Sequence, residues 1–325
     1  MNSNASAIVQ LLQNASGFVS GERISRELGI SRTAVWKHIS VLRDSGYRIE
    51  AVTSRGYRLI SVPEILDAGL ISAQLATVRV GRRIEYFKQT VSTNADAFRL
   101  AEEGAEEGTV VLADSQSGGK GRRGRVWSSP AAVNLYCSVV LRPAIMLHQA
   151  TQLTFLSAVA VARAIEKSGG CVPSIKWPND ILISEKKVAG LLNEMSAETD
   201  GINFVILGIG VNLNMLPEQF PLDLRYPATS LLIETGSRVE RGHFAVLLLD
   251  ELDTLYGDFL QHGFGPVREE WQQRCNARDR RVIVSDTGTG EVSGMFAGID
   301  EDGALLLRSA TGAVERVISG DARVL

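Results

Sequence analysis

The chain of 325 residues has few cysteines and no cysteine pair of the Cys-x-x-Cys type. Its three cysteines are far apart in the sequence: Cys137, Cys171 and Cys275. This usage argues against a disulfide framework or a zinc site, and it fits a reducing compartment, so we expect a cytoplasmic protein. The four histidines also lack the spacing of metal ligands, and we interpret them as structural: His38, His148, His243 and His262.

Signals for membranes and export are missing as well. No apolar run approaches the roughly 18–20 residues that a membrane-spanning helix needs. The chain begins Met-Asn-Ser-Asn-Ala-Ser, without a basic region ahead of an apolar stretch. We therefore expect no secretion signal and no membrane partner.

Two common phosphate-binding patterns are absent, but another basic, glycine-rich segment is present. No Ser or Thr follows Lys120 as a P-loop requires. The Gly-x-Gly-x-x-Gly order at the head of a helix is also missing. Residues 118–127 instead hold four glycines, four cations and Trp127. Glycine lets backbone N–H groups approach a ligand closely, and fixed cations favour a phosphate-bearing ligand such as ATP or an acyl-adenylate. A solvated basic loop is the alternative.

Length and charge indicate several domains with different partners. At roughly 100–200 residues each, 325 residues suggest two or three domains. Residues 1–60 contain eight Lys or Arg and four Asp or Glu, a net charge of +4 within a chain of net −3, so the remainder carries −7. A basic module on an acidic body indicates that only the first module meets a polyanion.

The basic module has the pattern of a winged helix-turn-helix. Helical apolar spacing predicts helices near 7–12, from Ser20 or Gly21 to Gly29, and after a cap at Ser31. Alternating segments 47–52 and 56–60 predict a wing. Because the last helix of such a module enters the major groove, we predict a set of DNA contacts: Ser31, Arg32, Thr33, Trp36, Lys37 and, in the wing, Arg55. Trp36 could instead pack against the wing, and a protein–protein module is the alternative to DNA binding.

After the basic module, the predicted secondary structure changes once, from alternating strands and helices to strands alone. Strands and helices alternate through the middle, and connections as short as residues 184–187 require antiparallel strands. We therefore predict an α+β domain with a mixed sheet rather than a doubly wound parallel fold. From Arg280 onward, short strands and glycine turns, including 287–290, predict a small β-barrel. The expected domain boundaries are 1–64, 65–274 and 275–325.

Polar residues gather at the ends of the predicted strands in the middle domain. They form four clusters besides the glycine-rich run: Ser92-Thr93-Asn94, Lys176-Trp177-Pro178-Asn179-Asp180, Lys187-Val188-Ala189-Gly190 and Gly208-Ile209-Gly210-Val211-Asn212. In this order and spacing they closely resemble the motifs of bacterial biotin–protein ligases of the bifunctional kind, which also repress the biotin operon. The resemblance covers essentially the whole chain. It implies a winged helix-turn-helix, a central biotin/lipoate-ligase-like domain and a C-terminal SH3-like barrel.

The resemblance implies a biotin–[acetyl-CoA-carboxylase] ligase. Biotin and MgATP would give biotinyl-5′-adenylate, and a lysine of a biotin carboxyl carrier protein would then take the biotin. The adenylate-bound homodimer would bind operator DNA. Arg122 and Lys187 would stabilise charge on the phosphate, and loop closure would protect the adenylate from water. Asp180 would orient or deprotonate the acceptor amine, Trp127 would pack beside biotin, and Asn179 would meet phosphate or metal.

The same resemblance implies the residues that contact biotin and its adenylate. They are Ser92, Thr93, Asn94, Gln116, Gly119, Lys120, Gly121, Arg122, Arg123, Gly124, Arg125, Trp127, Lys176, Asn179, Lys187, Gly190, Gly208, Gly210 and Asn212. The family usually has arginine at Lys120, and lysine keeps the charge but loses the planar fork. The proline-rich segment 217–227 offers no motif for adenine contacts.

Structural interpretations remain beside the functional ones. Lys176 and Lys187 could be solvated charges at strand ends, Asp180 a turn former, and Gly208 and Gly210 bulge glycines. Two other functions remain open: a transcription factor that senses a small acid without catalysis, and a lipoate or octanoate ligase of related architecture. The intact Arg122, Lys187 and Asp180 argue against the first, and the glycine-rich loop and winged helix argue against the second.

Overall fold

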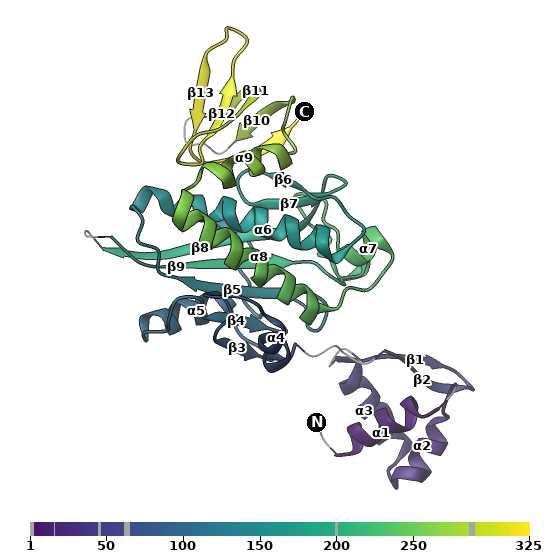
Figure 1. Ribbon diagram of the computed structural model, residues 1–325. Helices are drawn as coiled ribbons and strands as arrows, with labels where there is room; N and C mark the ends of the chain where they lie inside the picture. Colours follow the sequence, from purple (N-terminus) through teal and green to yellow (C-terminus); the bar gives the residue numbers. More distant parts are fainter. Residues whose placement is uncertain (1–2, 16, 45–46, 62–65, 199–200, 286–289) are drawn as a thin grey trace. The chain divides into compact units, whose positions relative to one another are not determined.

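The computed structural model describes residues 3–15, 17–44, 47–61, 66–198, 201–285 and 290–325 (Figure 1). The chain divides into two compact units, residues 1–65 and residues 66–325. The expected domain boundary at residue 64 and most of the expected turn at 287–290 lie outside the described residues. Within the described ranges, no helix combines the length and apolarity needed to cross a bilayer.

The first unit is the predicted winged helix-turn-helix. Its elements are α1 (Ser3–Gln13), α2 (Gly21–Leu28), α3 (Arg32–Asp44), β1 (Arg48–Val52) and β2 (Gly56–Ser61). The Ser20 hydroxyl accepts the N–H of Arg23 at the start of α2, and Gly29 ends that helix with φ 64°. The Ser31 hydroxyl accepts the N–H of Ala34 at 3.1 Å and caps α3, as predicted.

The wing has a further backbone partner that the sequence did not reveal, an isolated bridge at Val19. Val19 and Tyr57 exchange backbone hydrogen bonds of 2.8 and 2.9 Å. Gly56 lies beside them with φ 103°, and a Cβ at this position would overlap the Val19 carbonyl. Glycine is therefore required where β2 begins, because it admits both the dihedral angle and the close backbone approach.

The second unit is built on the predicted mixed sheet. Its strands are β3 (Ile84–Phe87), β4 (Val110–Ala113), β5 (Leu135–Leu141), β6 (Ser174–Lys176), β7 (Asp180–Ile183), β8 (Lys186–Glu198) and β9 (Gly201–Val211). The spatial order is β3-β4-β5-β9-β8-β7-β6. Only the β3–β4 pair is parallel among the described strands, and the other pairs are antiparallel.

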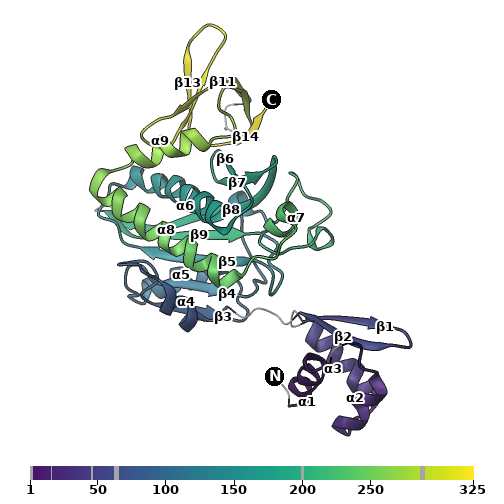
Figure 2. The same cartoon turned by 45° about the vertical axis from the view of Figure 1, so that its right-hand side comes forward.

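Helices cover both faces of this sheet. Figures 1 and 2 show α6 (Gln152–Ser168) and α8 (Arg241–His262) side by side on one face. Helix α5 (Thr93–Glu102) packs on the other face. Successive residues of β4 follow this division: Val110 and Leu112 join the core under α6 and α8, whereas Val111 packs with Ala97 and Ala101 of α5. The strand is buried on both faces, so it reads as an unbroken apolar run.

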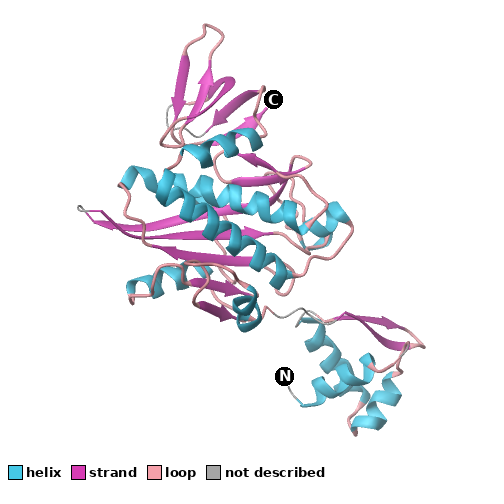
Figure 3. Ribbon diagram, viewed as in Figure 1, coloured by secondary structure: helices cyan, strands magenta, loops and turns pink. Residues whose placement is uncertain are grey.

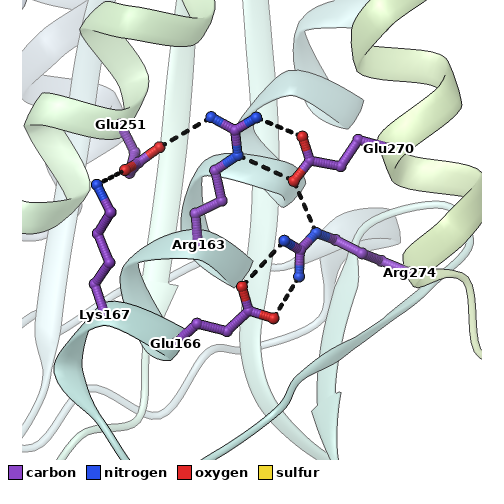
Figure 4. Close-up of polar contacts among 6 residues, drawn as sticks. All are labelled: Arg163, Glu166, Lys167, Glu251, Glu270 and Arg274. Carbon is purple, nitrogen blue, oxygen red and sulfur yellow. Dashed lines mark hydrogen bonds and ion pairs between the residues drawn. The ribbon is translucent and has the colours of Figure 1, made fainter.

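A network of ion pairs joins the helices on the face of the sheet that α6 and α8 cover (Figure 4). Glu270 of α9 (Gly265–Arg274) accepts hydrogen bonds from Arg163 of α6 and from Arg274. Arg163 also pairs with Glu251 of α8, and Arg274 pairs with Glu166 of α6. The guanidinium forks therefore tie three helices through charge-assisted bonds.

The C-terminal segment is wholly β in the described residues, as Figure 3 shows by colour. Its strands pair antiparallel in the order β13-β12-β11-β10-β14, with bounds β10 (Arg281–Ser285), β11 (Val292–Ile299), β12 (Leu305–Arg308), β13 (Val314–Val317) and β14 (Asp321–Val324). The Trp177 indole N–H donates to the Gly303 carbonyl at 3.1 Å, which connects this sheet to the turn between β6 and β7.

Some elements differ from the sequence-based expectation. The short strands that the sequence predicts at 188–192 and 204–207 are parts of longer ones: β8 and β9 run for 13 and 11 residues, because they pair with each other along most of their length. The small helix that the sequence predicts within residues 61–80 is α4 (Ala68–Gln74), whereas two helices have no predicted counterpart, α7 (Leu231–Thr235) and α9. In α9 only Val267 and Trp271 are buried, too few apolar positions to give a helical signal.

We predict that Glu270→Gln destabilises the second unit by about 1–3 kcal/mol at neutral pH, because two guanidinium groups lose a charged acceptor. Burial opposes the charge of Glu270, but hydrogen bonds from Arg163 and Arg274 outweigh it and hold the pKa of Glu270 below its usual value. A carboxyl with a lowered pKa stabilises the fold above its unfolded-state pKa and loses this effect as pH falls through its folded-state pKa.

The difference in Tm between the native chain and Glu270→Gln should therefore be largest near neutrality and shrink in acid. Thermal unfolding at a series of pH values measures it. Glu269→Gln, an exposed neighbour on the same helix, is the control. Equal Tm shifts for the two variants would contradict a role for the network.

Candidate functional site

One cavity of about 670 Å³ opens where the strands of the second unit end. The glycine-rich loop, the β6–β7 turn, β8, β9, residues 220–228 and the start of β14 form its wall. Six basic side chains and three carboxylates line it, and this excess of positive charge favours an anionic ligand. The cavity gathers most of the predicted site: Ser92, Thr93, Asn94, Gln116, Lys120, Gly121, Arg122, Arg125, Trp127, Lys176, Asn179, Asp180, Lys187, Gly190, Gly208, Gly210 and Asn212.

Three predicted residues, all within the described ranges, lie outside this wall. Gly119 supports the loop from behind, since a Cβ there would lie 2.5 Å from the Trp127 carbonyl oxygen. Arg123 faces a neighbouring cavity of about 340 Å³ that Arg122 also lines. Gly124 has φ 73° and serves the turn at the loop tip. The structure thus gives Gly119 and Gly124 backbone roles.

The glycine-rich loop is folded as a small hairpin. Lys120 and Val126 form an antiparallel bridge, and the Gly121 N–H donates to the Arg125 carbonyl at 2.7 Å. Residues 122–124 make a 3-10 turn in which Arg123 has φ 58°. This turn aims Arg122 and Arg125 into the cavity while the hairpin base leads directly to Trp127.

Trp127 rests on two glycines that face each other across neighbouring strands. Gly190 of β8 pairs with Gly210 of β9. A Cβ would lie 2.9 Å from the indole ring at Gly190 and 2.6 Å from the indole nitrogen at Gly210. The missing side chains therefore create a flat seat for the ring. The indole N–H is buried against the sheet and has no hydrogen-bond partner among the described residues.

The Ser-Thr-Asn cluster is a connected hydrogen-bond network. The Thr93 N–H donates to Gln116 Oε1 at 2.8 Å, and the Asn94 amide donates to the Leu192 carbonyl at 3.0 Å and to Glu194 at 2.7 Å. The Ser138 hydroxyl of β5 donates to Asn94 Oδ1 at 2.7 Å and lies within hydrogen-bond distance, 2.9 Å, of the Thr93 hydroxyl. The sequence did not predict Ser138 and Glu194 as site residues, because isolated polar residues on strands form no motif.

Ser92 begins α5 without using its hydroxyl as a cap. The side chain is buried and lines the cavity, so its hydroxyl is free of the usual helix-capping role. Two other predicted residues have structural partners. Gly208 admits the Asn94 amide, since a Cβ would overlap it, and Asn212 donates to the Thr229 carbonyl at 3.1 Å.

Two lysines and one carboxylate form the charged centre of the cavity. Lys187 Nζ lies 2.6 Å from Asp180 and 5.3 Å from the centroid of the Trp127 ring. Lys176 Nζ lies 3.8 Å from the centroid of Tyr226. Burial lowers the pKa of Lys176, and neighbouring Asp180 opposes that effect. Neither lysine is a solvated surface charge, which argues against the structural interpretation of both.

Arg122 reaches the β6–β7 turn. Its guanidinium donates to Asn179 Oδ1 at 3.3 Å, and the Asn179 amide donates to the Leu191 carbonyl at 2.6 Å. Burial lowers the pKa of Arg122, with Asp321 opposing it. A guanidinium held in a partly dry site without a full ionic partner is suited to an incoming phosphate.

Asp321, at the start of β14, is a site residue that the sequence did not reveal. It pairs with Arg125 of the hairpin and with Arg225 at 2.7 Å. Burial works against its charge, but the bond from Arg125 and the nearby Arg225 outweigh this and hold the pKa of Asp321 below its usual value. The C-terminal sheet thereby holds two cavity loops.

Segment 220–228 supplies further wall residues that were missed. Phe220, Leu224 and Tyr226 line the cavity, and Arg225 lies over the Tyr226 ring. An aromatic ring flanked by cations is suited to a flat, electron-rich group. The only signal in the sequence was the pairing of Arg225 with Tyr226 inside a proline-rich loop, which by itself is too common to interpret.

In the first unit, α3 presents the predicted contact residues to solvent. Val35, Ile39 and Leu42 are each 1% exposed and hold the helix to the core. The opposite positions are exposed: Ser31, Arg32, Thr33, Trp36 and Lys37. Trp36 is 60% exposed, so it is not packed against the wing. Neither Arg32 nor Lys37 makes an ion pair within the described part of the chain, which leaves both charges available to a polyanion.

The wing arginines share an aromatic support. The Arg55 guanidinium lies 4.4 Å and that of Arg58 4.8 Å from the centroid of Phe18. Arg58 also pairs with Glu50 at 2.6 Å, whereas Arg55 is exposed at the turn. The stacking holds the two cations on one side of the wing.

Comparison with known proteins agrees with this architecture. Residues 4–58 match an HTH domain, residues 86–212 match the Biotin/lipoate A/B protein ligase family, and residues 279–324 match the Biotin protein ligase C terminal domain. The fold and the cavity thus define a protein ligase of the biotin/lipoate class joined to a helix-turn-helix module.

Full-length relatives narrow this class. The bifunctional ligase/repressor BirA of Bacillus subtilis is 42% identical over 320 residues, which span 97% of this chain and 96% of that protein. The Escherichia coli protein of the same description is 32% identical over 92% of this chain and 91% of its own length. The chain belongs to the family of bifunctional biotin ligase/repressor proteins.

A solved structure supports the same family assignment. The biotin protein ligase from Aquifex aeolicus, in complex with biotin and ATP, superposes with a TM-score of 0.64 at 28% identity. The alignment covers 75% of this chain and 99% of that one.

We predict that Asp321→Asn loosens both loops that this carboxylate holds. Losing about 1 kcal/mol of local stability would raise the open population roughly 5-fold. Limited trypsin digestion with mass analysis should therefore show faster cleavage at residues 120–125 and after Arg225. Asp302→Asn, whose carboxylate pairs with Arg316 instead, is the control. Unchanged cleavage at both loops in Asp321→Asn would refute this role.

Proposed function

We propose that this chain is an ATP-dependent biotin–protein ligase that also represses biotin biosynthesis genes. The observation that carries the proposal is the cavity, in which the apolar seat of Trp127 lies next to Arg122, Lys176 and Lys187. Such a cavity matches a ligand with an apolar ring at one end and a phosphate at the other. The exposed basic face of α3 supports DNA binding by the first unit. Because both proposed activities, ATP use and operator binding, belong to the cytoplasm, we propose that the protein acts there.

The first step joins biotin to AMP. An oxygen of the biotin carboxylate attacks the α-phosphorus of ATP, a new P–O bond forms, and the bond to pyrophosphate breaks. Negative charge grows on the phosphoryl oxygens and on the leaving pyrophosphate. Arg122 and Lys187 are the cations we assign to this charge, because fixed cations in a partly dry site stabilise it without reorganising. Lys176 adds a third positive charge beside Tyr226.

Mg²⁺ would enter as a complex with ATP. Asn179 and Asp180 are adjacent and both line the cavity, and they offer the oxygen ligands that Mg²⁺ prefers. The ion supplies charge neutralisation at the phosphates. Asn179 already accepts from Arg122, and Asp180 pairs with Lys187, so most ligands would come from the nucleotide and water.

The second step transfers biotin to a lysine of a biotin carboxyl carrier protein of acetyl-CoA carboxylase. The lysine nitrogen attacks the activated carbonyl, an amide forms, AMP leaves and the nitrogen loses a proton. We assign Asp180 to orient the amine or accept that proton. The hairpin 120–126, held by Asp321, would keep water from the mixed anhydride.

We further propose that adenylate binding favours a homodimer and that this dimer binds a two-part operator. In this proposal residues 1–64 form the DNA-binding domain, 65–274 the catalytic domain and 275–325 the C-terminal domain. The contacts assigned to biotin and its adenylate are the cavity residues named above, with Gly119, Arg123 and Gly124 supporting the loop. The DNA contacts are Ser31, Arg32, Thr33, Trp36, Lys37 and Arg55.

Biotin-dependent exchange of labelled pyrophosphate into ATP tests the enzymatic proposal. We expect exchange with biotin and none with lipoate or octanoate in its place. Exchange with lipoate alone would reassign the substrate. A chain that binds biotin but shows no exchange would be a sensor without catalysis.

We predict that Arg122→Gly increases release of free biotinyl-adenylate. Removing the guanidinium loses its bond to Asn179 and its charge near the phosphate, so adenylate dissociation should rise by about 10-fold or more, as for a charged hydrogen bond of 1.5–3 kcal/mol. Rapid filtration of preformed adenylate measures the rate. Arg278→Gly, which removes a guanidinium that is 63% exposed and outside the cavity wall, is the control. Equal rates for the native chain and Arg122→Gly would mean that this residue does not retain the adenylate.

We also predict that Lys37→Ala weakens operator binding and lowers the salt dependence of log K by about one unit, because one phosphate contact is lost. Fluorescence anisotropy at several salt concentrations, with adenylate bound, gives this slope. Arg99→Ala removes an exposed cation from α5 of the second unit and should leave the slope unchanged. An operator affinity that does not depend on the adenylate would argue against a ligand-controlled repressor.

A further inference from the structure

Two adjacent lysines at the start of β8 point to different partners. Lys187 lines the cavity and pairs with Asp180 at 2.6 Å. Lys186 lies outside the cavity wall, and its Nζ is 2.9 Å from Glu234 Oε1 on α7. Successive side chains of a strand point to opposite faces, so a shift of one residue would exchange the two lysines.

The β7–β8 hairpin does not settle this register by itself. Its two-residue turn, Ser184–Glu185, has positive φ at both positions and places Ile183 opposite Lys186 and Leu182 opposite Lys187. The next pair is Ile181 with Ala189, so Val188 is an extra residue. A bulge interrupts the ladder immediately beside Lys187, and a bulge at a neighbouring position would aim a different side chain at the cavity.

At Lys187, a loop segment is hydrogen-bonded to the edge of β8 that lies opposite β7. Pairing with β9 begins only at Ala189. Before that, the Lys187 N–H donates to the Pro227 carbonyl at 2.8 Å, and the Thr229 N–H donates to the Lys187 carbonyl at 2.9 Å. Residues 227–229 therefore replace β9 beside the lysine.

One carboxylate oxygen connects the loop segment and the strand. Glu234 Oε1 accepts from the Thr229 hydroxyl at 2.6 Å as well as from Lys186. The Glu234 side chain is 11% exposed, so its bonds are shielded from solvent. It draws Lys186 away from the cavity and fixes Thr229 against the Lys187 backbone.

We propose that Glu234 is a positioning residue that sets the strand register at which Lys187, and not Lys186, enters the cavity. The proposal rests on the proposed function, because it matters only if Lys187 acts on the phosphate. Glu234 acts through Lys187 and does not line the cavity itself. Its loss should affect the chemical step more than biotin binding, whose seat at Gly190 and Gly210 lies beyond the bulge.

The test uses the full chain in the pyrophosphate-exchange assay. Glu234→Ala should lower kcat by roughly 10- to 100-fold, the range expected when a reacting group is displaced by about 1 Å. KM for biotin should stay within about 2-fold, because uniform binding is unchanged. Glu234→Gln keeps an oxygen acceptor for Thr229 and Lys186, so it should restore most of kcat.

A double variant separates positioning from general damage to the fold. If Glu234 acts through Lys187, adding Glu234→Ala to Lys187→Met should cost at most about 2-fold, since groups that act as a unit are not additive. If the kcat losses of the two single variants multiply in the double variant, the proposal is overturned. Thr229→Val removes the bond from Thr229 to Glu234 and should lower kcat in the same direction, which keeps the test usable if Glu234→Ala folds poorly.

Glu185→Ala is the matched control. Glu185 precedes Lys186 in the same turn, but it is 61% exposed and pairs with Arg280, so its removal should leave kcat unchanged. No exchange by the native chain would refute the proposed function, whereas full exchange by Lys187→Met would refute the role of Lys187 and, with it, that of Glu234. An active native chain, an impaired Lys187→Met and an undiminished Glu234→Ala would overturn only the role of Glu234.

Discussion

The pairing of Gly190 with Gly210 across β8 and β9 is the constraint on which the site depends. Two side chains are missing at directly opposed positions, so the sheet surface is flat enough to seat the Trp127 indole. Trp127 in turn ends the glycine-rich hairpin, and this places Arg122 and Arg125 over the same cavity. A Cβ at either glycine would displace the indole. It would thereby also displace Arg122 and Arg125, whose positions depend on that of the indole.

Charge is arranged around this seat by contacts from three directions. Lys187 lies at the start of β8, Lys176 at the end of β6 and Arg122 in the hairpin, and each has a partner that leaves it partly available. Asp321 pairs with Arg125 and Arg225 and holds two loops at once. The cavity keeps a positive excess while its loops remain tied, which suits a phosphate-bearing intermediate that must be made and retained in one place.

Sequence patterns predicted a large share of this arrangement, and the reasons are local. The caps at Ser20 and Ser31, the apolar spacing of α3 and the continuous apolar strand β4 follow from rules that act within a few residues. The motifs around Ser92, Trp127, Asn179 and Lys187 fall at the ends of such elements, so their convergence followed from the predicted sheet. Asp321, Tyr226, Ser138 and Glu194 were missed because each is a single polar or aromatic residue without a local pattern, and its role arises from a distant partner. The sequence also could not show that Gly119 and Gly124 shape the loop, whereas Arg122 enters the cavity.

The sequence by itself determined the succession of elements, the basic character of the first unit and the motifs that meet at the strand ends, because propensity, periodicity and net charge are properties of neighbouring residues. Only the tertiary structure decided which of two adjacent lysines enters the cavity, which carboxylate of the C-terminal sheet holds the loops, and which glycines seat the indole. These depend on strand register and on contacts between residues such as Arg125 and Asp321, which lie far apart in the chain and are brought together by packing.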